Sequence, residues 1–375
     1  MAEPFKNLIN PELVRACGQH LQRQWRDFDR RGFERRALDG LEGLEMKARA
    51  MQVADALEAT LPDDFDRAAG IIEAALAPPA TSDDLGFRTT DAGLAGWIGW
   101  PLGEFIARRG QAEPARALLA LRELTQRFTS EFAVRPFLIN HFDVTMAQLL
   151  AWRDDPSPHV RRWTSEGSRP RLPWGLQVKS LIADPSPTLP LLRALQDDPS
   201  PYVRRSVANH LNDIAKDHPG VVADWLEAHL PTAGTERRAL LQHASRSLVK
   251  RGDRRVLKAW GLGGSLRGEA TLALTPRRVA IGDSLQLSAT LVSTARTSQT
   301  LAVDYLVHHV KANGETAPKV FKGWTLVLAA GEARKLEKKH SMRPITTRRY
   351  YPGEHAVELQ VNGKIVARES FKLLT

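Results

Sequence analysis

The stretch DDPSPHVRR at residues 154–162 returns as DDPSPYVRR at residues 197–205, and the only difference is His159 in place of Tyr202. In each copy an aspartate or serine can cap a helix whose first turn tolerates proline. The 43-residue spacing fits a HEAT-type hairpin of two helices. Because one such hairpin cannot bury its apolar face alone, the repeat predicts a stack of hairpins with a concave face.

The chain up to residue 262 shows a helical pattern. Segments such as 41–61 and 223–230 place apolar residues three and four positions apart, and breaks such as 108–114 contain glycine or proline. No alternating strand pattern interrupts them. We therefore expect an all-α, HEAT-like repeat domain at residues 1–262.

After the glycine-rich GLGGS at 261–265 the pattern changes to short strands. Residues 285–292 and 355–361 alternate or are rich in β-formers, and the Asn-Gly pair at 362–363 favours a tight hairpin. We expect a small all-β, immunoglobulin-like sandwich at residues 266–375. The predicted protein is thus multi-domain, with a helical solenoid followed by a β-sandwich.

Composition bounds the compartment. The chain has 375 residues and a single cysteine, which excludes an internal disulfide and a cysteine-based zinc cluster. No window approaches the roughly 20 apolar residues that span a bilayer. The first residues lack the layout of a secretory signal. We expect a cytoplasmic protein that does not enter the membrane.

The charge favours a polyanionic partner. The formal net charge is +10, and residues 265–375 carry 17 Lys and Arg against 9 Asp and Glu. An ordinary basic protein would also fit these numbers, so the placement of the cations matters more than their sum.

Paired arginines recur at one place in the repeat. Stacked hairpins would align them into a stripe that tracks a phosphate backbone. A solvated outer face, or a capping device in an array that binds proteins, would also explain them. The pairs are Arg161 and Arg162, Arg204 and Arg205, and Arg237 and Arg238, with His210 and His243 extending the stripe.

The first copy continues into a stretch dense in functional side chains, WTSEGSRPRLPWG. Arg162 and Glu166 are four residues apart and share a helix face, where an ordinary ion pair is the alternative. Arg169, Arg171 and Trp174 follow in a proline-stiffened loop. A tryptophan there either packs into the array or meets a flat ligand such as a base or a sugar.

Two further stretches are candidates for the site. In residues 127–143, Glu131 precedes Arg135 by four positions on a helix that Pro136 should kink or break. GWIGWPLGEF contains Trp100, which is either aromatic core or a contact. We find no phosphate-binding glycine loop, no serine-nucleophile motif, and no metal-ligand spacing beyond His308-His309, which falls in an expected strand. Neither a metal nor a cofactor is therefore predicted.

Four stretches carry a resemblance to a known family: MAEPFKNLINPELV, TSEFAVRPFL, DDPSPHVRRWTSEGSRPRLPW and DDPSPYVRRSVANHLNDIAKDHP. Together they resemble the AlkC branch of the AlkD-like DNA alkylation-repair glycosylases, over roughly residues 1–260. Some members append an immunoglobulin-like domain. The resemblance implies a monofunctional glycosylase that removes cationic bases such as 3-methylcytosine, 1-methyladenine and 3-methyladenine, without enclosing the base in a pocket.

The resemblance also implies roles. A cationic base is a good leaving group, so the protein must stabilise an oxocarbenium-like sugar and position a water. Glu131 and Glu166 are the candidates for these tasks. Trp174 would contact the lesion nucleotide, and Arg162 would hold a phosphate or orient a carboxylate. AlkD-type members rely on an aspartate, whereas this chain offers glutamates in the matching stretches.

The implied partner is double-stranded DNA with alkylated bases, bound by a monomer. The β-domain would clamp the duplex through arginines 277–278, lysines 338–339 and the stretch TTRRYYPGEH at 346–355. A catalytically silent protein that binds damaged DNA and a HEAT-type adaptor for proteins are the alternatives. The residues expected to contact DNA are Arg161, Arg162, Arg169, Arg171, Arg204, Arg205, Arg237, Arg238, Trp100, Arg135, Arg348 and Arg349.

Overall fold

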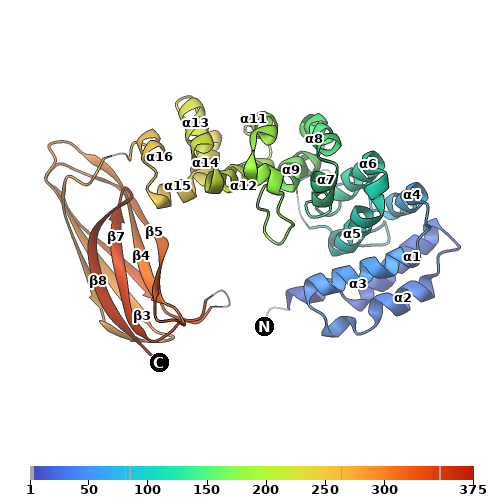
Figure 1. Ribbon diagram of the computed structural model, residues 1–375, viewed down its shortest axis with the longest axis horizontal. Coiled ribbons are helices and arrows are strands. Elements are labelled where there is room, and N and C mark those ends of the chain that lie inside the picture. The colour runs from blue at the N-terminus through green and yellow to red at the C-terminus, as the bar shows by residue number, and fades with distance from the viewer. Residues whose placement is uncertain (1–3, 81, 84–85, 263, 346–347) are drawn as a thin grey trace. The chain divides into compact units, whose positions relative to one another are not determined.

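The computed structural model divides into two compact units (Figure 1). The helical unit comprises Met1–Asp217 and Gly234–Ala244, and the second unit comprises His218–Ala233 and Ser245–Thr375. The residues that the structure describes are 4–80, 82–83, 86–262, 264–345 and 348–375. Within this part of the chain, no helix is long and apolar enough to span a bilayer.

The helices of the helical unit pack each against its neighbours, and buried residues between Ile9 and Leu181 form a continuous apolar core. The contacts α3 to α5, α4 to α6, α6 to α8, α9 to α12 and α12 to α14 link successive hairpins. The elements are η1 Phe5–Leu8, α1 Pro11–Gln24, α2 Arg30–Leu38, η2 Leu41–Gly43, α3 Met46–Glu58, α4 Phe65–Ala75, η3 Gly96–Ile98, α5 Gly99–Arg109, η4 Gly110–Ala112, α6 Pro114–Thr125, α7 Arg135–Asn140, α8 Phe142–Ala151, η5 Trp152–Asp154, α9 Pro158–Gly167, α10 Lys179–Ala183, η6 Ser186–Thr188, α11 Leu189–Leu195, α12 Pro201–Asp217 and α14 Thr235–Ala244.

The repeated DDPSP stretch forms the same turn twice, immediately before α9 and α12. The carboxylate of Asp155 accepts a hydrogen bond from the amide of Ser157 at 2.8 Å, and that of Asp198 accepts one from Ser200 at 2.9 Å. Each aspartate thus closes a local turn, and the second proline then starts the helix. A serine caps only the second copy, where the Ser200 hydroxyl accepts from the amide of Tyr202 at 3.2 Å.

The first arginine of each copy fastens this turn. Arg161 donates to the main-chain carbonyl of Asp155 at 2.8 Å and, through two nitrogens, to the carboxylate of Asp198 at 2.6 and 3.0 Å. Arg204 repeats the contact with the carbonyl of Asp198 at 2.6 Å, and Arg122 on α6 donates to the carboxylate of Asp155. We call Arg122, Arg161 and Arg204 the arginine ladder. Arg122 and Arg161 each bind the aspartate of the next hairpin, and Arg204 lies 3.6 Å from Glu236 at the start of α14.

The second unit is a sandwich of two sheets with an apolar core between them. The strand orders are β1-β3-β6 and β2-β8-β7-β4-β5. Asn362 and Gly363 have φ angles of 46° and 77° in the β7–β8 turn, as the Asn-Gly pair predicts. The elements are α13 Pro219–His229, α15 Arg246–Arg251, α16 Arg254–Ala259, β1 Gly268–Thr275, β2 Arg278–Ala280, β3 Ser284–Ser293, β4 Gln299–Val310, β5 Thr316–Leu328, β6 Ala333–Ser341, β7 Gly353–Val361 and β8 Lys364–Leu374.

The predicted fold class is confirmed, since helices give way to strands between α16 and β1. The compact units divide earlier in the chain, because helices α13, α15 and α16 pack with one another or with the sandwich. Gly252 approaches Gly363 so closely that a Cβ on it would lie 2.8 Å from the Cα of Gly363. Gln360 also donates to the carbonyl of Lys250 at 3.1 Å. The helix expected at 41–61 begins only at Met46, after a separate 3-10 turn.

Candidate active site

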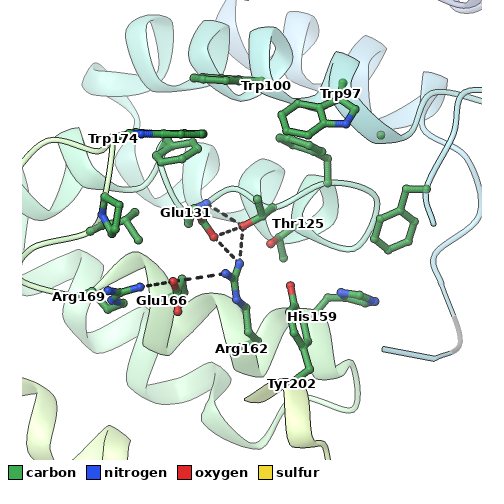
Figure 2. A pocket seen from close by; sticks show the side chains of 17 residues that line it. Trp97, Trp100, Thr125, Glu131, His159, Arg162, Glu166, Arg169, Trp174 and Tyr202 are labelled. Atoms are coloured by element: carbon green, nitrogen blue, oxygen red, sulfur yellow. Dashed lines mark hydrogen bonds and ion pairs between the residues drawn. The ribbon is translucent and has the colours of Figure 1, made fainter. Parts of the chain in front are cut away.

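A cleft of about 450 Å³ opens in the helical unit, and the predicted catalytic residues line it (Figure 2). Its walls come from segments far apart in the sequence: η3 and α5, the turn before α7, α9 with the loop that follows it, and the start of α12. The lining residues are Phe87, Gly96, Trp97, Trp100, Thr125, Phe128, Thr129, Glu131, Phe132, His159, Arg162, Glu166, Arg169, Leu172, Pro173, Trp174 and Tyr202.

Glu131 lies in a turn and not on a helix, which corrects the sequence-based expectation. Residues 131–134 form the turn, and α7 begins at Arg135 with Pro136 in its first helical turn. Proline is favoured there, because the missing N–H has no intrahelical partner in any case. Pro136 therefore starts a helix instead of kinking one, and the turn leaves Glu131 at the cleft.

Arg162 joins the two predicted carboxylates (Figure 2). One of its nitrogens donates to Glu131 Oε2 and, at 2.8 Å, to the hydroxyl of Thr129, and its other terminal nitrogen lies 3.5 Å from Glu166 Oε1. The hydroxyl of Thr129 in turn donates to Glu131 Oε2 at 2.8 Å. The ion pair expected from the four-residue spacing of Arg162 and Glu166 is present, and Arg162 extends it to a second carboxylate.

Glu166 is buried and held by several donors. Arg169 contacts its Oε1 at 2.5 Å, and the hydroxyl of Ser206 on α12 donates to its Oε2 at 2.6 Å. Burial raises the pKa of Glu166, but Arg162, Arg169 and Ser206 outweigh burial, so this pKa lies below its ordinary value. Glu166 is therefore a fixed negative charge at neutral pH.

Asp213 completes this network and was not found in the sequence. Its carboxylate accepts from Arg169 at 2.8 Å and from Lys216 at 2.7 Å. Ser206 and Asp213 are seven residues apart, so both lie on the face of α12 that is turned toward α9. The seven-residue spacing of Ser206 and Asp213 in SVANHLNDIA could have indicated that both lie on one helix face. The sequence around Thr129 contains no comparable pattern.

Trp174 is exposed at the edge of the cleft. Its side chain is 76% exposed, and its φ of 66° places a non-glycine residue in the left-handed region. Backbone strain of this kind is found at binding sites and active sites. Of the two expectations for this residue, the structure excludes packing into the array.

Trp100 belongs to an aromatic wall of the cleft and is mostly buried. Its ring stacks on Phe132 with centroids 5.3 Å apart, and only 9% of the residue is exposed. Trp97 contacts Phe128 beside it, with centroids 5.1 Å apart. Trp100 thus shapes the cleft, and its contact with DNA remains a prediction.

The one position at which the two copies differ lies inside the cleft. The rings of His159 and Tyr202 meet edge-on with centroids 5.7 Å apart, and the guanidinium of Arg162 lies over the Tyr202 ring at 5.1 Å. His159 donates to the carbonyl of Ser82 at 2.8 Å, and burial lowers the pKa of the ring, which favours its uncharged form at neutral pH. The two copies thus face each other across their differing residues.

Several arginines predicted to contact DNA have other partners. The prediction is wrong for Arg135, which is fully buried and donates to the carbonyls of Gly167 at 2.8 Å and of Leu176. Arg169 is only 7% exposed, because it is placed between Glu166 and Asp213. Both guanidinium groups are engaged in hydrogen bonds or ion pairs within the protein.

The predicted arginine stripe is therefore incomplete. Arg161 and Arg204 hold the arginine ladder together and are not free to bind phosphate. The buried His210 donates to the carbonyl of Ser165 at 2.9 Å and does not extend the stripe. His243 bonds Asn209 at 2.8 Å.

The remaining predicted contacts lie at the surface. Arg171 and Arg237 each form a bidentate ion pair, with Asp217 and Asp197. In the β-sandwich, Arg348 donates to His309 at 2.8 Å. Residues 346–347 of the predicted clamp stretch lie outside the described residues. The side chains that are exposed and remain predicted DNA contacts are Arg205, Arg238 and Arg349.

In the described part of the chain, no group of three His, Cys, Asp or Glu residues is arranged to hold a metal ion.

The fold and the site together describe a helical-repeat protein with a carboxylate–arginine cleft and an appended β-sandwich. Residues 269–375 match the family model described as "Uncharacterised protein YhaZ, C-terminal Ig-like domain".

Two full-length relatives extend this match. The uncharacterized protein YhaZ of Bacillus subtilis is 35% identical over 367 residues, which are 96% of this chain and 97% of YhaZ. The alkylpurine DNA glycosylase AlkC of Pseudomonas fluorescens, solved bound to DNA with an abasic-site analogue, is 34% identical, with a TM-score of 0.89 and full coverage of both chains. The chain belongs to the AlkC branch of the HEAT-like repeat DNA alkylation-repair glycosylases, as the sequence stretches indicated.

Proposed function

We propose that this AlkC-family protein is a DNA glycosylase that hydrolyses the N-glycosidic bond of cationic N-alkylated bases. The bases are 3-methylcytosine, 1-methyladenine and 3-methyladenine. The observation that carries the proposal is the convergence of Glu131 and Glu166, from two separate segments, on Arg162 in a cleft bordered by the exposed Trp174. AlkC of P. fluorescens, which matches over the whole chain, was solved with DNA containing the analogue of an abasic site.

The reaction needs a negative charge near the sugar and a positioned water. The bond between C1′ and the base nitrogen breaks, and its electrons leave with the base and neutralise its positive charge. A water oxygen then bonds to C1′ and loses a proton to a carboxylate or to solvent. Because the base leaves neutral, no acid has to protonate it, and the main task is to stabilise the cationic sugar.

The two glutamates suit different parts of this task. Both oxygens of Glu166 are held by donors, which fits a fixed charge that stabilises the oxocarbenium-like sugar. The donors to Glu131, Thr129 and Arg162, both bind Oε2. Its Oε1 is then available to orient a water and accept a proton, so we assign the water to Glu131. Trp174 would contact the lesion nucleotide.

The assay is a direct one. Duplex oligonucleotides with a single 3-methylcytosine, 1-methyladenine or 3-methyladenine are incubated with the protein, and alkaline cleavage reveals abasic sites. We expect abasic product that depends on the lesion and on the enzyme. Tight binding to each duplex without any abasic product would instead identify a catalytically silent damage-binding protein.

We further propose a division of labour, with residues 1–262 as the glycosylase part and the sandwich at 266–375 as a DNA clamp. The protein would act as a monomer on DNA in the cytoplasm. Lys339 and Arg349 are exposed on the sandwich and suit phosphate contacts. Substituting both with alanine in the full chain should weaken DNA binding about tenfold and reduce the salt dependence by about two counterions. Unchanged affinity would assign the sandwich another role.

A further inference from the structure

The N-terminal segment is fixed to the helical unit by a buried arginine. Arg49 on α3 is 2% exposed, and one of its nitrogens donates to the carbonyls of Lys6 at 3.1 Å and Ile9 at 2.8 Å. Ile9 is fully buried, and Lys6 forms an ion pair with Glu45 at 2.9 Å. The 3-10 helix η1 is therefore a built element, although nothing in the catalytic cleft explains why it is held so firmly.

This anchoring places the ring of Phe5 at the edge of the cleft. The Phe5 ring meets Trp97 edge-on, with centroids 4.8 Å apart and an interplanar angle of 85°. It also approaches Trp174, with centroids 6.4 Å apart and an angle of 59°. Trp97 and Trp174 line the cleft, as Figure 2 shows. We call Phe5, Trp97 and Trp174 the aromatic mouth.

The aromatic mouth is exposed where a folded protein usually covers such rings. Phe5 is 48% exposed and Trp174 is 76% exposed, and two segments remote in the sequence bring them together. Their contact therefore depends on two costly features, the buried guanidinium of Arg49 and the left-handed backbone of Trp174. Exposed apolar groups held in this way mark a binding surface.

The chemistry of the mouth selects a nucleobase as its ligand. Its three side chains are aromatic and uncharged, so they offer mainly flat apolar surface, and the indole N–H groups are their only hydrogen-bond donors. The proposed hydrolysis removes the damaged base from the base stack of the duplex. A neighbouring base then loses a stacking partner, and an aromatic side chain can replace it whatever the base is.

We propose that the aromatic mouth is a nucleobase subsite, in which Phe5 stacks on a base next to the damaged nucleotide. The proposal rests on the proposed function, since it takes the cleft as the place of the lesion. It gives the N-terminal stretch PFKNL a role in substrate binding.

A thermodynamic cycle tests the stacking. Affinity is measured for duplexes that contain a tetrahydrofuran abasic analogue at the lesion position. In further duplexes, a second tetrahydrofuran replaces the 5′ neighbour, the 3′ neighbour or the opposite base, one at a time. For one of these positions, base removal should weaken binding of the wild type about tenfold, and binding of Phe5→Ala by less than about twofold.

Matched variants separate stacking from general effects. Phe5→Tyr should keep the wild-type response, and Phe5→Leu, which keeps apolar volume without a ring, should behave as Phe5→Ala. Leu119→Ala on α6 removes an apolar side chain of similar exposure, 49%, outside the cleft, and should respond as the wild type. Since Phe5 is half-exposed, its variants should melt at the wild-type temperature.

Two results would overturn the proposal. One is an equal response of wild type and Phe5→Ala to base removal at all three positions. The other is a wild-type response in Phe5→Leu. Excision of methylated bases is measured separately, so a wild type that shows the cycle without excision would contradict the proposed function alone. A wild type that excises without the cycle would contradict only the subsite.

Discussion

The two copies of the repeated stretch form the same turn but lead into different segments. After the first copy, α9 ends after 10 residues at Gly167 and the chain enters the loop that carries Trp174. After the second copy, α12 continues for 17 residues. The second arginine of the first copy, Arg162, reaches into the cleft, whereas its counterpart Arg205 is exposed. Identical residues therefore set the local structure, and their continuations set the function.

The difference also divides the work within one site. The helix that follows the first copy supplies Glu166. The helix that follows the second copy supports it through Ser206, which donates to Glu166, and His210, which donates to the carbonyl of Ser165. Gly167 ends α9 against Val134, since a Cβ at that position would lie 2.6 Å from a methyl carbon of Val134. The helix that carries the Glu166 carboxylate is thus stabilised by contacts from the next repeat.

The largest expected effect is on the carboxylate paired with the first copy. Glu131→Gln keeps the size of the side chain but removes its charge and its capacity as a base, so the single-turnover excision rate should fall about 10³-fold with little change in DNA affinity. The matched control is Glu236→Gln, because Glu236 lies 3.6 Å from Arg204 of the second copy. Equal rates for both variants would remove the functional distinction between the copies.

Acid should lower the stability of the helical unit through His210, which lies on α12 after the second copy. Burial lowers the pKa of His210 to about 4, so its neutral form is stabilised by folding. Above the unfolded pKa of about 6.5, His210 does not reduce the free energy of unfolding. As the pH falls from there toward 4, only the unfolded ring gains a proton, and the free energy of unfolding decreases by up to about 3 kcal/mol. Urea unfolding of the wild type and His210→Asn at pH 7, 5.5 and 4.5 measures this loss.

The pH comparison isolates one histidine among several. Burial also lowers the pKa of His309 to about 3 and that of His340 to about 4 in the sandwich, and both remain in the His210→Asn variant. The slope of stability with pH should therefore be smaller, though still present, in the variant. A variant with the wild-type slope would show that His210 does not carry the effect.

The arginine ladder should be stronger at the first copy. Arg161→Ala leaves the buried carboxylate of Asp198 without its bidentate partner, and we expect a loss of about 2 kcal/mol in the free energy of unfolding. Arg204→Ala removes carbonyl contacts and a distant pair with the exposed Glu236, at a cost of about 1 kcal/mol. Chemical denaturation gives both values, and a reversed order would refute the ladder.

The smallest expected effect is at Arg205. Arg205→Ala should weaken DNA binding about threefold for undamaged and damaged duplexes alike, and should reduce the salt dependence by about one counterion. The excision rate at saturating enzyme should stay at the wild-type value. If excision fell while affinity held, Arg205 would belong to the chemistry and not to a phosphate contact.

The sequence predicted the fold where strong local patterns exist. The helical periodicity, the strand alternation and the Asn-Gly turn at Asn362 all correspond to structure. The motif residues Glu131, Glu166 and Trp174 meet in one cleft, but their catalytic roles stay predictions. The helix expected at Glu131 was wrong, because Pro136 was interpreted as an interior residue when it occupies a first turn.

The misjudged arginines have a geometric reason. Adjacent residues on a helix point about 100° apart, so the two members of an Arg-Arg pair cannot serve one stripe. Arg161 turns toward the ladder and Arg162 toward the cleft. Thr129, Ser206 and Asp213 were missed because the residues that tie them to the site, Arg162, Glu166 and Arg169, lie 33 or more residues away in the sequence. The spacing of residues within one helix does not identify such distant partners.

The arginine ladder has a consequence for how such a protein changes in length. Each DDPSP turn offers carbonyls to the arginine that follows it and a carboxylate to the arginine of the preceding hairpin. A 43-residue unit therefore contains both the aspartate turn and the arginine that link it to its neighbours. Duplicating such a gene segment inserts a hairpin that already fits its neighbours on both sides. The number of hairpins can then evolve separately from the cleft, which has to be built only once.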